Sequence, residues 1–339
     1  MKKRHIICIV AALLSLAAAY GKELSFERKD YNIRIFYNDT AFPGDAVFVR
    51  LYFVQSARQH RKAPEGFAAA KAQLELYLDA KRLDKAAFYA LPAESGRNGN
   101  SYMNAFLCGI PLSSWWQEKN NYHLSVACTL PDGTTETLEL PFALTHKDFV
   151  SETIPLDDRN TSIKTDTSSK RTDQINRLNA ILGTVTESSV FQTAAYTPPT
   201  PATRRTSFFA DRRVYTYTNG KSSTSLHYGI DYGVPTGSRV TACAAGTVVM
   251  AEDRISTGWS VVIEHLPGLY SLYYHMSELK VKTGDTVQPG DLVGLSGATG
   301  LATGPHLHWE MRLNMSAVSP DFFTTDFTSE EEARKALSQ

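Results

Sequence analysis

Short segments in which polar and apolar residues alternate run along the chain from residue 23 to residue 148. Because successive side chains of a strand point to opposite faces, this period of two predicts half-buried β-strands. The predicted strands are Asn32–Phe36, Ala46–Phe53, Gln73–Leu78, Met103–Cys108, Tyr122–Leu130 and Thr135–Leu140. Turn residues such as Pro131-Asp132-Gly133 separate them. The pattern predicts an antiparallel β-sandwich over residues 23–148, with an immunoglobulin-like arrangement as one form of it.

The pattern changes between residues 149 and 206, which we interpret as a linker with one short helix. Ile175, Leu178 and Leu182 recur at helical spacing before Gly183, so a helix is expected at about 171–182. The segment Asp157–Ser169 is polar and is expected to be irregular. The run Thr197-Pro198-Pro199-Thr200-Pro201 favours an extended, semi-rigid connection. The boundary between two domains is therefore placed in this region.

Residues 207–325 are again rich in strand-forming residues, now with many glycines between them. Two stretches resemble each other: 237–249 and 284–293 each contain a strand, a tight turn with Gly and a second strand. This pattern indicates a second compact domain built mainly from an antiparallel sheet. Residues 326–339 are interpreted as a C-terminal tail.

The first 19 residues have the three parts of a secretory signal peptide. Lys2, Lys3 and Arg4 form a basic start, Ile6–Leu16 is uncharged and apolar, and three alanines at 17–19 supply small residues for cleavage. The apolar run is too short to cross a bilayer easily, so no transmembrane segment is expected in the mature chain. The expected location is the periplasm or the extracellular cell envelope.

Charge and cysteine content narrow the function classes. Lys and Arg number 35, as do Asp and Glu, which argues against a protein built to bind nucleic acid. Of the four cysteines, Cys8 leaves with the signal peptide, and export permits a disulfide between Cys108 and Cys128. Spacing alone cannot show whether those two residues meet. Cys243 lies among small residues without an evident partner His, so we interpret it as a buried filler.

Two short motifs in the second domain carry residues suited to a metal. His227 and Asp231 are four residues apart, and His306 and His308 are two apart, so each pair shares one face of a strand. Imidazole nitrogens and a carboxylate oxygen are good ligands for Zn²⁺. Three protein ligands would leave a fourth position for water, which is typical of a catalytic zinc site. His60, His123 and His146 are scattered and are not expected to bind metal.

Four blocks in order give residues 208–323 a resemblance to the M23 family of zinc metallopeptidases, also called lysostaphin-like or LytM-like. The blocks are His227-Tyr228-Gly229-Ile230-Asp231, Tyr273-Tyr274-His275-Met276-Ser277, Gly284-Asp285-Thr286-Val287-Gln288-Pro289-Gly290 and Thr303-Gly304-Pro305-His306-Leu307-His308-Trp309-Glu310. Met276 stands where the family usually has Leu. The match covers about a third of the chain and leaves the predicted sandwich outside it.

The resemblance implies a role for five residues. His227, Asp231 and His308 would bind one Zn²⁺ per chain, His306 would orient or deprotonate the attacking water, and His275 would help to hold the developing charge. It further implies a LytM-like β-sheet and an exported endopeptidase that cleaves stem peptides or cross-links of peptidoglycan. His265 would be a structural turn residue. Trp259 and Trp309 are interpreted as packing residues or groove walls, and Arg212 and Arg213 as solvated charges.

Two other functions remain to be weighed against the enzyme. A non-catalytic LytM-like regulator would use the same groove to activate a cell-wall amidase, but the complete set of five residues argues against it. A lipoyl-like carrier would need a modifiable Lys within its hairpin, whereas Lys280 and Lys282 precede the turn. The N-terminal domain has no catalytic cluster; positioning the enzyme on the wall, binding a cell-wall protein and sending the linker across the groove are all open roles for it.

Overall fold

The computed structural model describes residues 22–28, 31–56, 71–98, 101–118, 121–130, 133–325 and 327. The predicted signal peptide, His60 and nearly all of the predicted tail lie outside these residues. The chain divides into two compact units, one made of Met1–His146 with Thr328–Gln339 and the other of Lys147–Phe327. Among the described residues, no helix is both long and apolar enough to cross a membrane.

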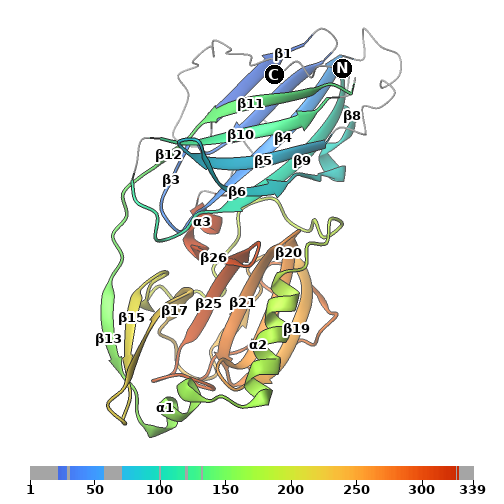
Figure 1. Ribbon diagram of the computed structural model, residues 1–339. Coiled ribbons are helices and arrows are strands. Elements are labelled where there is room, and N and C mark those ends of the chain that lie inside the picture. The colour runs from blue at the N-terminus through green and yellow to red at the C-terminus, as the bar shows by residue number, and fades with distance from the viewer. Residues whose placement is uncertain are drawn as a thin grey trace. The chain divides into compact units, whose positions relative to one another are not determined.

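The first unit contains a six-stranded sheet and a four-stranded sheet, both antiparallel (Figure 1). The larger has the order β1-β2-β4-β9-β7 with β8 beside β9, and the smaller has the order β11-β10-β5-β6, while β12 and β3 form a parallel pair. The elements are β1 (Lys22–Glu27), β2 (Asn32–Tyr37), β3 (Thr40–Ala41), β4 (Ala46–Ser56), β5 (Lys71–Leu78), β6 (Lys81–Ala87), β7 (Tyr89–Ala90), the 3₁₀ helix η2 (Pro92–Glu94), β8 (Gly96–Asn98), β9 (Ser101–Pro111), β10 (Tyr122–Thr129), β11 (Thr135–Pro141) and β12 (Ala143–Leu144).

One apolar core joins the two sheets of this unit. Ile35 and Val49 from the larger sheet and Leu76, Val126 and Leu140 from the smaller one are all fully buried in the same cluster. Along β4, every second residue from Val47 to Phe53 belongs to this cluster, as the period of two predicts. Two antiparallel sheets over a shared core form a sandwich, so the predicted class is confirmed. The immunoglobulin-like arrangement stays a prediction.

Cys108 and Cys128 do not form the disulfide that the sequence allowed. Both are buried as free thiols, and burial raises the pKa of each, that of Cys128 to about 12. Cys108 contacts the backbone of Leu74 on β5, whereas Cys128 contacts that of Glu136 on β11. Cys108 on β9 thus approaches β5 of the facing sheet, whereas Cys128 on β10 approaches its neighbour β11 within its own sheet.

The second unit is built around an eight-stranded antiparallel sheet of order β14-β17-β25-β21-β20-β19-β23, with β26 beside β25. Two three-stranded sheets accompany it, β18-β24-β22 and β13-β15-β16. The elements are β13 (Ser151–Pro155), α1 (Asp158–Thr165), α2 (Ser169–Leu182), β14 (Arg205–Ser207), β15 (Arg212–Thr216), β16 (Ser222–Leu226), β17 (Gly229–Tyr232), β18 (Arg239–Thr241), β19 (Gly246–Arg254), β20 (Gly258–Leu266), β21 (Leu269–Met276), β22 (Glu278–Leu279), β23 (Thr286–Val287), β24 (Leu292–Leu295), β25 (Leu307–Leu313), β26 (Ser316–Val318) and α3 (Pro320–Thr325).

The two similar stretches of the sequence become paired strands of this unit. Strand β18 pairs with β24, and β19 pairs with β23. Gly284 and Gly290, which stand before the second pair of strands, have φ of 97° and 87°. Only Gly adopts this region without a steric cost from Cβ. The repeated Gly therefore marks the tight turns, as the pattern predicts.

The segment 149–206 belongs to the second unit and does not act as a separate linker. Strand β13 pairs in parallel with β15, and α2 covers one face of the large sheet, where Leu182 packs beside Met250 and Tyr270 (Figure 1). The Pro-rich stretch is also attached to this unit, because the Pro199 carbonyl accepts a hydrogen bond from Thr241 N at 2.9 Å. Composition correctly predicted that the Pro-rich stretch is extended, but it could not show that the segment packs on the second unit.

Helix α2 matches the predicted helix, and α1 contradicts the prediction of irregular chain. Asp157 caps α1 by accepting a bond from Asn160 N, while the buried residues of α1 are the polar Asn160 and Thr161. A helix without an apolar stripe leaves no periodic signal in the sequence. In α2 the exposed Ile175 takes no part in the core, and Gln174 is buried instead, bonded to Asp253 O and Ile255 N.

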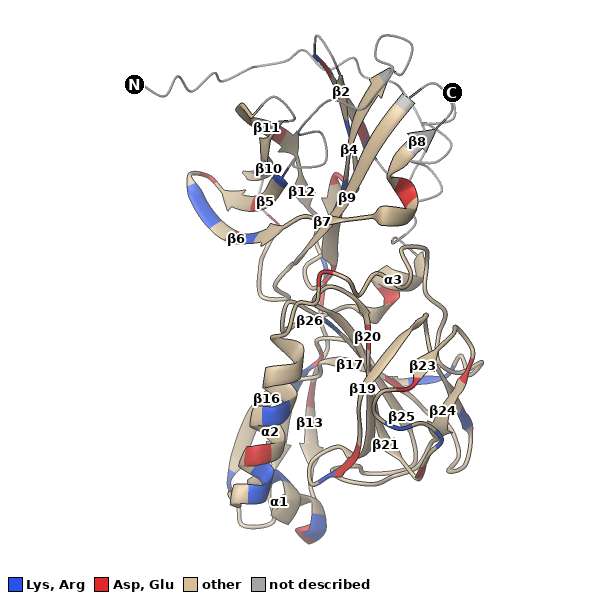
Figure 2. Ribbon diagram, turned by 90° about the vertical axis from the view of Figure 1, so that its right-hand side faces the viewer, with Lys and Arg blue, Asp and Glu red and all other residues tan. Residues whose placement is uncertain are grey.

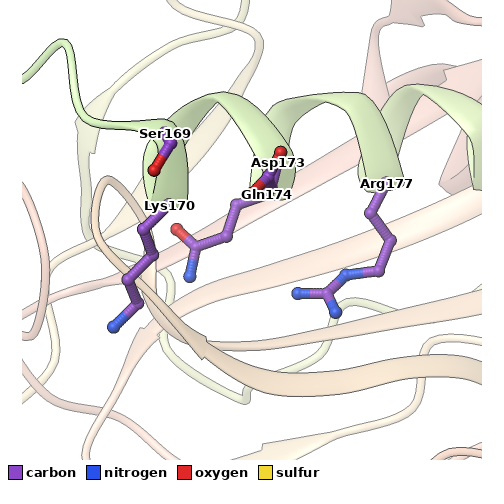
Figure 3. Close-up of a pocket in the computed structure, with 5 residues that line it drawn as sticks. All are labelled: Ser169, Lys170, Asp173, Gln174 and Arg177. Atoms are coloured by element: carbon purple, nitrogen blue, oxygen red, sulfur yellow. The ribbon is translucent and has the colours of Figure 1, made fainter.

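A shallow cavity of about 340 Å³ lies along α2 and is lined by Ser169, Lys170, Asp173, Gln174 and Arg177 (Figure 3). Lys170, Gln174 and Arg177 extend from the same side of the helix. Gln174 is bonded to the backbone of β19 and its following turn, and Arg177 pairs with Glu252 at 2.7 Å. These contacts hold α2 on the sheet, so the cavity is a feature of its docking.

Candidate metal centre and active site

Strands β17 and β25 bring the two predicted metal motifs together. They are antiparallel neighbours, and the register places Asp231 directly opposite His308. His227 lies in the turn before β17 and is buried with them. A Cβ on Gly229 would lie 2.3 Å from Trp309 O and 2.9 Å from His308 Nε2. The motif therefore needs Gly at its centre so that the two strands can pair beside the cluster.

One potential ligand atom from each of His227, Asp231 and His308 meets at a single point. His227 Nε2 lies 3.0 Å from Asp231 Oδ1 and 3.0 Å from His308 Nδ1, and the last two atoms are 2.9 Å apart. Ligands of a tetrahedral zinc ion, each at about 2.0–2.1 Å, are about 3.3 Å from one another. The three buried donors thus fit a zinc ion by type and by spacing.

Hydrogen bonds fix the ring nitrogens that face the cluster. His227 Nδ1 donates to Phe208 O at 2.8 Å, which leaves the lone pair of Nε2 for a metal. His308 uses the opposite nitrogen, because its Nε2 lies 3.2 Å from Glu310 Oε2 while Nδ1 faces Asp231. Such outer partners set the tautomer and the orientation of metal-binding histidines.

His306 and His275 lie beside the three ligand candidates. His306 Nδ1 donates to Gly304 O and His275 Nδ1 donates to Thr299 O, both at 2.8 Å. The centroids of the two rings are 4.7 Å apart, and His306 Nε2 lies 3.7 Å from Asp231 Oδ1. His275 has φ of 61°, an uncommon value for a residue with Cβ, and a bond from its N to Thr257 O helps to hold it. The fold therefore brings all five predicted residues into one site.

Residues 225–320 match the model of Peptidase family M23, and the matched segment contains all five of these residues. This chain carries an M23 metallopeptidase domain. The family model matches only this part of the chain, so it says nothing of the first unit or of the segment 147–224.

Curated relatives of the M23 domain include proteins named for work on peptidoglycan. The DD-carboxypeptidase/endopeptidase Mpg of Neisseria meningitidis is 41% identical over 95 residues, which is 28% of this chain and 22% of the relative. Peptidoglycan DD-endopeptidase ShyA of Vibrio cholerae is 39% identical over 108 residues, 32% of this chain and 24% of the relative. The chain thus spans less than a quarter of the length of either. A crystal structure of a zinc containing peptidase from Vibrio cholerae is also similar, with 18% identity and a TM-score of 0.32, covering 80% of this chain and 55% of the other.

The charges of the M23 domain favour a cation between Asp231 and His308. Burial opposes ionisation of Asp231, but hydrogen bonds from His227 and His308 outweigh it and hold the pKa of that carboxyl well below its usual range. Burial also lowers the pKa of His308, yet bonds to Asp231 and Glu310 overcome this and raise it to about 9. The cluster therefore binds a proton tightly, and a metal ion held by the same two atoms would replace that proton.

His275 behaves differently from His308 because no carboxylate touches it. Burial, followed by the nearby His306 and His308, lowers the pKa of His275 to about 3. The ring is therefore neutral at physiological pH. Since Nδ1 carries the hydrogen that bonds Thr299 O, the neutral ring presents an unprotonated Nε2.

Arg213 is an outer partner of the metal cluster, which corrects its interpretation as a solvated charge. Its Nη2 donates to Asp231 Oδ2 at 3.2 Å, and its Nε donates to Glu152 Oε1 at 2.8 Å. Arg213 thereby fixes the carboxylate oxygen that does not face the cluster. Arg212 does not share this role: it donates to Ala210 O and lies over the ring of Phe149.

Sequence reasoning missed Glu310, Arg213 and Glu152 as supports of the site. Glu310 had a signal, because it lies two residues after His308 and so shares its face of β25. It also accepts from Arg312, which lies over the ring of Tyr228. Glu152 had no signal, because the pairing of β13 with β15 brings it to Arg213 from 61 residues away.

His265 and Cys243 form a buried polar group apart from the metal cluster. His265 is the penultimate residue of β20 and fully buried, so its interpretation as a turn residue is wrong. Its Nδ1 donates to Ala245 O at 2.7 Å, and its Nε2 lies 2.7 Å from Ser271 Oγ and 3.8 Å from Cys243 Sγ. Cys243 is a buried filler, as predicted, but the fold supplies the His neighbour that the sequence did not reveal. Burial raises its pKa to about 11, so the thiol is not activated.

The remaining predictions divide between surface and core. His123 stacks on Tyr77 in the first unit, and His146 is exposed. Trp309 is fully buried on β25 and packs in the core, whereas Trp259 on β20 keeps 40% of its surface exposed. Neither His123 nor His146 belongs to the three-residue metal cluster of the described chain.

Proposed function

We propose that this chain is an exported, zinc-dependent endopeptidase that hydrolyses peptide bonds in the stem peptides or cross-links of peptidoglycan. The observation that carries the proposal is the buried cluster of His227, Asp231 and His308 with His306 and His275 beside it. The name of the relative ShyA, a peptidoglycan DD-endopeptidase, supports peptidoglycan as substrate. Action on peptidoglycan would place the protein in the periplasm or the extracellular envelope, consistent with the signal-like start of the sequence.

His227, Asp231 and His308 would hold one zinc ion. When bound, zinc supplies a water of lowered pKa, about 7, and polarises a carbonyl. His306 is the proton acceptor for the attacking water, because its Nδ1–H is already given to Gly304 O and its Nε2 is free to accept. His306 then returns that proton toward the departing amine.

The hydrogen bond of His275 refines its proposed role. With its Nδ1–H given to Thr299 O, a neutral His275 has no N–H to offer to a developing negative charge. It can stabilise such charge only after Nε2 takes up a proton. The ring centroids of His275 and His306 are 4.7 Å apart, so both imidazoles border the same part of the site.

Digestion of purified muropeptides would test the proposed activity. The zinc-loaded protein should release peptide fragments, which mass spectrometry assigns to a particular bond, and a chelator should abolish the release until zinc is restored. Binding to muropeptides without cleavage, unaffected by the chelator, would overturn the enzyme and favour the non-catalytic regulator of an amidase.

Two variants separate metal binding from proton transfer. His308→Ala should lose both zinc and activity, because it removes a ligand. His306→Ala should lose activity and keep most of its zinc, because Nε2 of His306 accepts a proton and does not bind the metal. Zinc content by mass spectrometry distinguishes the cases, and loss of zinc from His306→Ala would show that the roles are wrongly assigned.

A further inference from the structure

Helix α1 connects two parts of the chain that border the metal cluster. Asn160 Nδ2 donates to Ala302 O at 3.3 Å, in the loop that leads to His306. On the other side, Thr161 Oγ1 accepts from Thr218 N at 3.5 Å, just beyond β15. Because both contacts come from adjacent residues, the two segments flank α1 closely. The helix therefore lies beside the site even though the family match begins only at residue 225.

Lys164 on α1 is a cation without an acidic partner. Its Nζ lies 4.3 Å from the ring centroid of Tyr215, and among the described residues no ion pair joins it to a carboxylate. The side chain is half-buried. An ammonium in this position has given up part of its water and retains hydrogen-bond donors that the aromatic face cannot satisfy.

Two residues, Tyr215 and Arg213, connect Lys164 to the metal cluster. Tyr215 and Arg213 are two residues apart on β15, so they share one face, and Arg213 donates to Asp231. Two residues of a strand span about 7 Å. The path also includes the 4.3 Å from the Lys164 ammonium to the Tyr215 ring and the length of the Arg213 side chain. Because an extended peptide advances about 3.3–3.6 Å per residue, a group bound at Lys164 would belong to a residue a few positions from the scissile bond.

The electrostatic surroundings of Lys164 favour an anion. Burial, followed by the positive charges of Arg171 and Arg213, lowers the pKa of Lys164. Arg213 is already bonded to Glu152 and Asp231, and Arg171 to Ser256 Oγ and Asp166 O. Lys164 has only the ring of Tyr215 against its ammonium in the described part of the chain, so it keeps its hydrogen-bond donors for a ligand. Figure 2 shows basic residues on both α1 and α2.

We propose that Lys164 and Tyr215 form a subsite that binds a free carboxylate of the substrate peptide. Lys164 supplies the charge-assisted hydrogen bond, and Tyr215 holds the ammonium in place from the opposite side. This inference rests on the proposed function, because it places the subsite a few residues from the peptide bond to be cut. The carboxylate comes either from an acidic side chain or from the C-terminus of the peptide.

Matched peptides with free and amidated carboxylates would test the subsite. We expect Lys164→Gln to raise KM about tenfold for the substrate with the free carboxylate and to leave the amidated substrate unchanged. Lys164→Arg should keep most of the preference. Lys170→Gln, on the exposed start of α2, is the control and should match the wild type on both substrates. Zinc content and circular dichroism check that each variant is folded and loaded.

Two amidated substrates identify the source of the carboxylate. One carries an amide at the acidic side chain and the other an amide at the C-terminus. The substrate whose KM is no longer changed by Lys164→Gln is the one in which the amide has replaced the bound carboxylate. Equal effects of Lys164→Gln on free and amidated substrates would overturn the subsite. If the wild type cleaves nothing, the proposed function fails, and calorimetric binding of the same peptides still decides the subsite by the same comparison.

Discussion

Each ligand candidate in the metal cluster is held by a partner on its outer side. Phe208 O orients His227, Glu310 faces the outer nitrogen of His308, and Arg213 bonds the outer oxygen of Asp231. Such partners raise metal affinity because they fix the ligand atoms before the metal arrives. These partners explain why the cluster is ordered. Substitution of a partner should therefore change metal affinity even though no ligand is removed.

Arg213→Met should weaken zinc binding without removing a ligand. The variant leaves Asp231 Oδ2 without its donor and Glu152 without its partner, and loss of such a support typically costs about 10–100-fold in affinity. Competition with a coloured chelator measures the zinc dissociation constant. Arg212→Met is the matched control, because Arg212 bonds Ala210 O and lies over the ring of Phe149. An unchanged dissociation constant in Arg213→Met would show that the bond to Asp231 has no part in metal affinity.

His265 should make the second unit less stable in acid. Burial lowers its pKa from 6.5 to about 4, so the folded protein keeps this ring neutral while the unfolded chain protonates it. The contribution is complete above about pH 6.5 and is lost as the pH falls toward about 4. The expected loss is about 3 kcal/mol over that window.

Urea unfolding of the wild type and of His265→Gln at pH 8 and pH 5 would measure this effect. The free energy of unfolding should fall more steeply with acidity in the wild type, because the variant has no ring to protonate. Other titrating groups are common to both proteins and cancel in the comparison. The same pH dependence in both would show that His265 is not the group responsible.

At the scale of elements, the site depends on the close pairing of β17 with β25. This pairing sets Asp231 opposite His308, and the small Gly229 allows the strands to approach. Strands β13 and β15 add the outer partners Glu152 and Arg213 from a second sheet. The metal cluster and its outer partners therefore depend on two strand pairings, each formed by segments distant in sequence.

Gly229→Ala should damage the metal cluster through the backbone. The added methyl group would lie 2.3 Å from Trp309 O, so the two strands must separate, at a cost of about 1–3 kcal/mol. Thermal unfolding and zinc affinity should both fall. Gly304→Ala is the control for stability, because no atom lies within 4 Å of its added Cβ. Wild-type stability in Gly229→Ala would mean that the strands tolerate the separation.

At the scale of the whole molecule, each unit has its own core and its own sheets. The second unit begins at Lys147, well before the segment that matches the M23 family. Helix α2 buries Leu182 against the large sheet, and Tyr196 stacks on Phe323. The predicted boundary at residue 207 would therefore cut through a packed unit.

A fragment of residues 147–327 should fold better than one of residues 207–327. The shorter fragment exposes the sheet face that α2 covers and loses Glu152, so it should melt at a lower temperature and bind zinc more weakly. Circular dichroism melts and zinc titration of both fragments would measure this. Equal melting temperatures would show that residues 147–206 add nothing to the stability of the peptidase sheet.

Local sequence patterns were sufficient for much of this description. Alternation placed the strands of the first unit, helical spacing and Gly183 placed α2, and ordered blocks identified the five site residues. These features depend on neighbours within a few positions, and the sequence displays them directly. The prediction of an irregular chain at Asp157–Ser169 was wrong. Helix α1 is stabilised by an Asp cap and by buried polar residues, which give the sequence no apolar period.

The sequence by itself indicated which side chains could bind a metal. It placed both histidine motifs on strands, whereas His227 lies just before β17 and His306 just before β25. Only the tertiary structure decided which distant residues meet: Glu152 reaches Arg213, Lys164 reaches Tyr215, and His265 reaches Cys243 from strands or helices far away in the chain. It also decided that residues 149–206 pack on the peptidase sheet. The physical reason is that pairing and burial join distant segments, and neither composition nor period specifies which segments will meet.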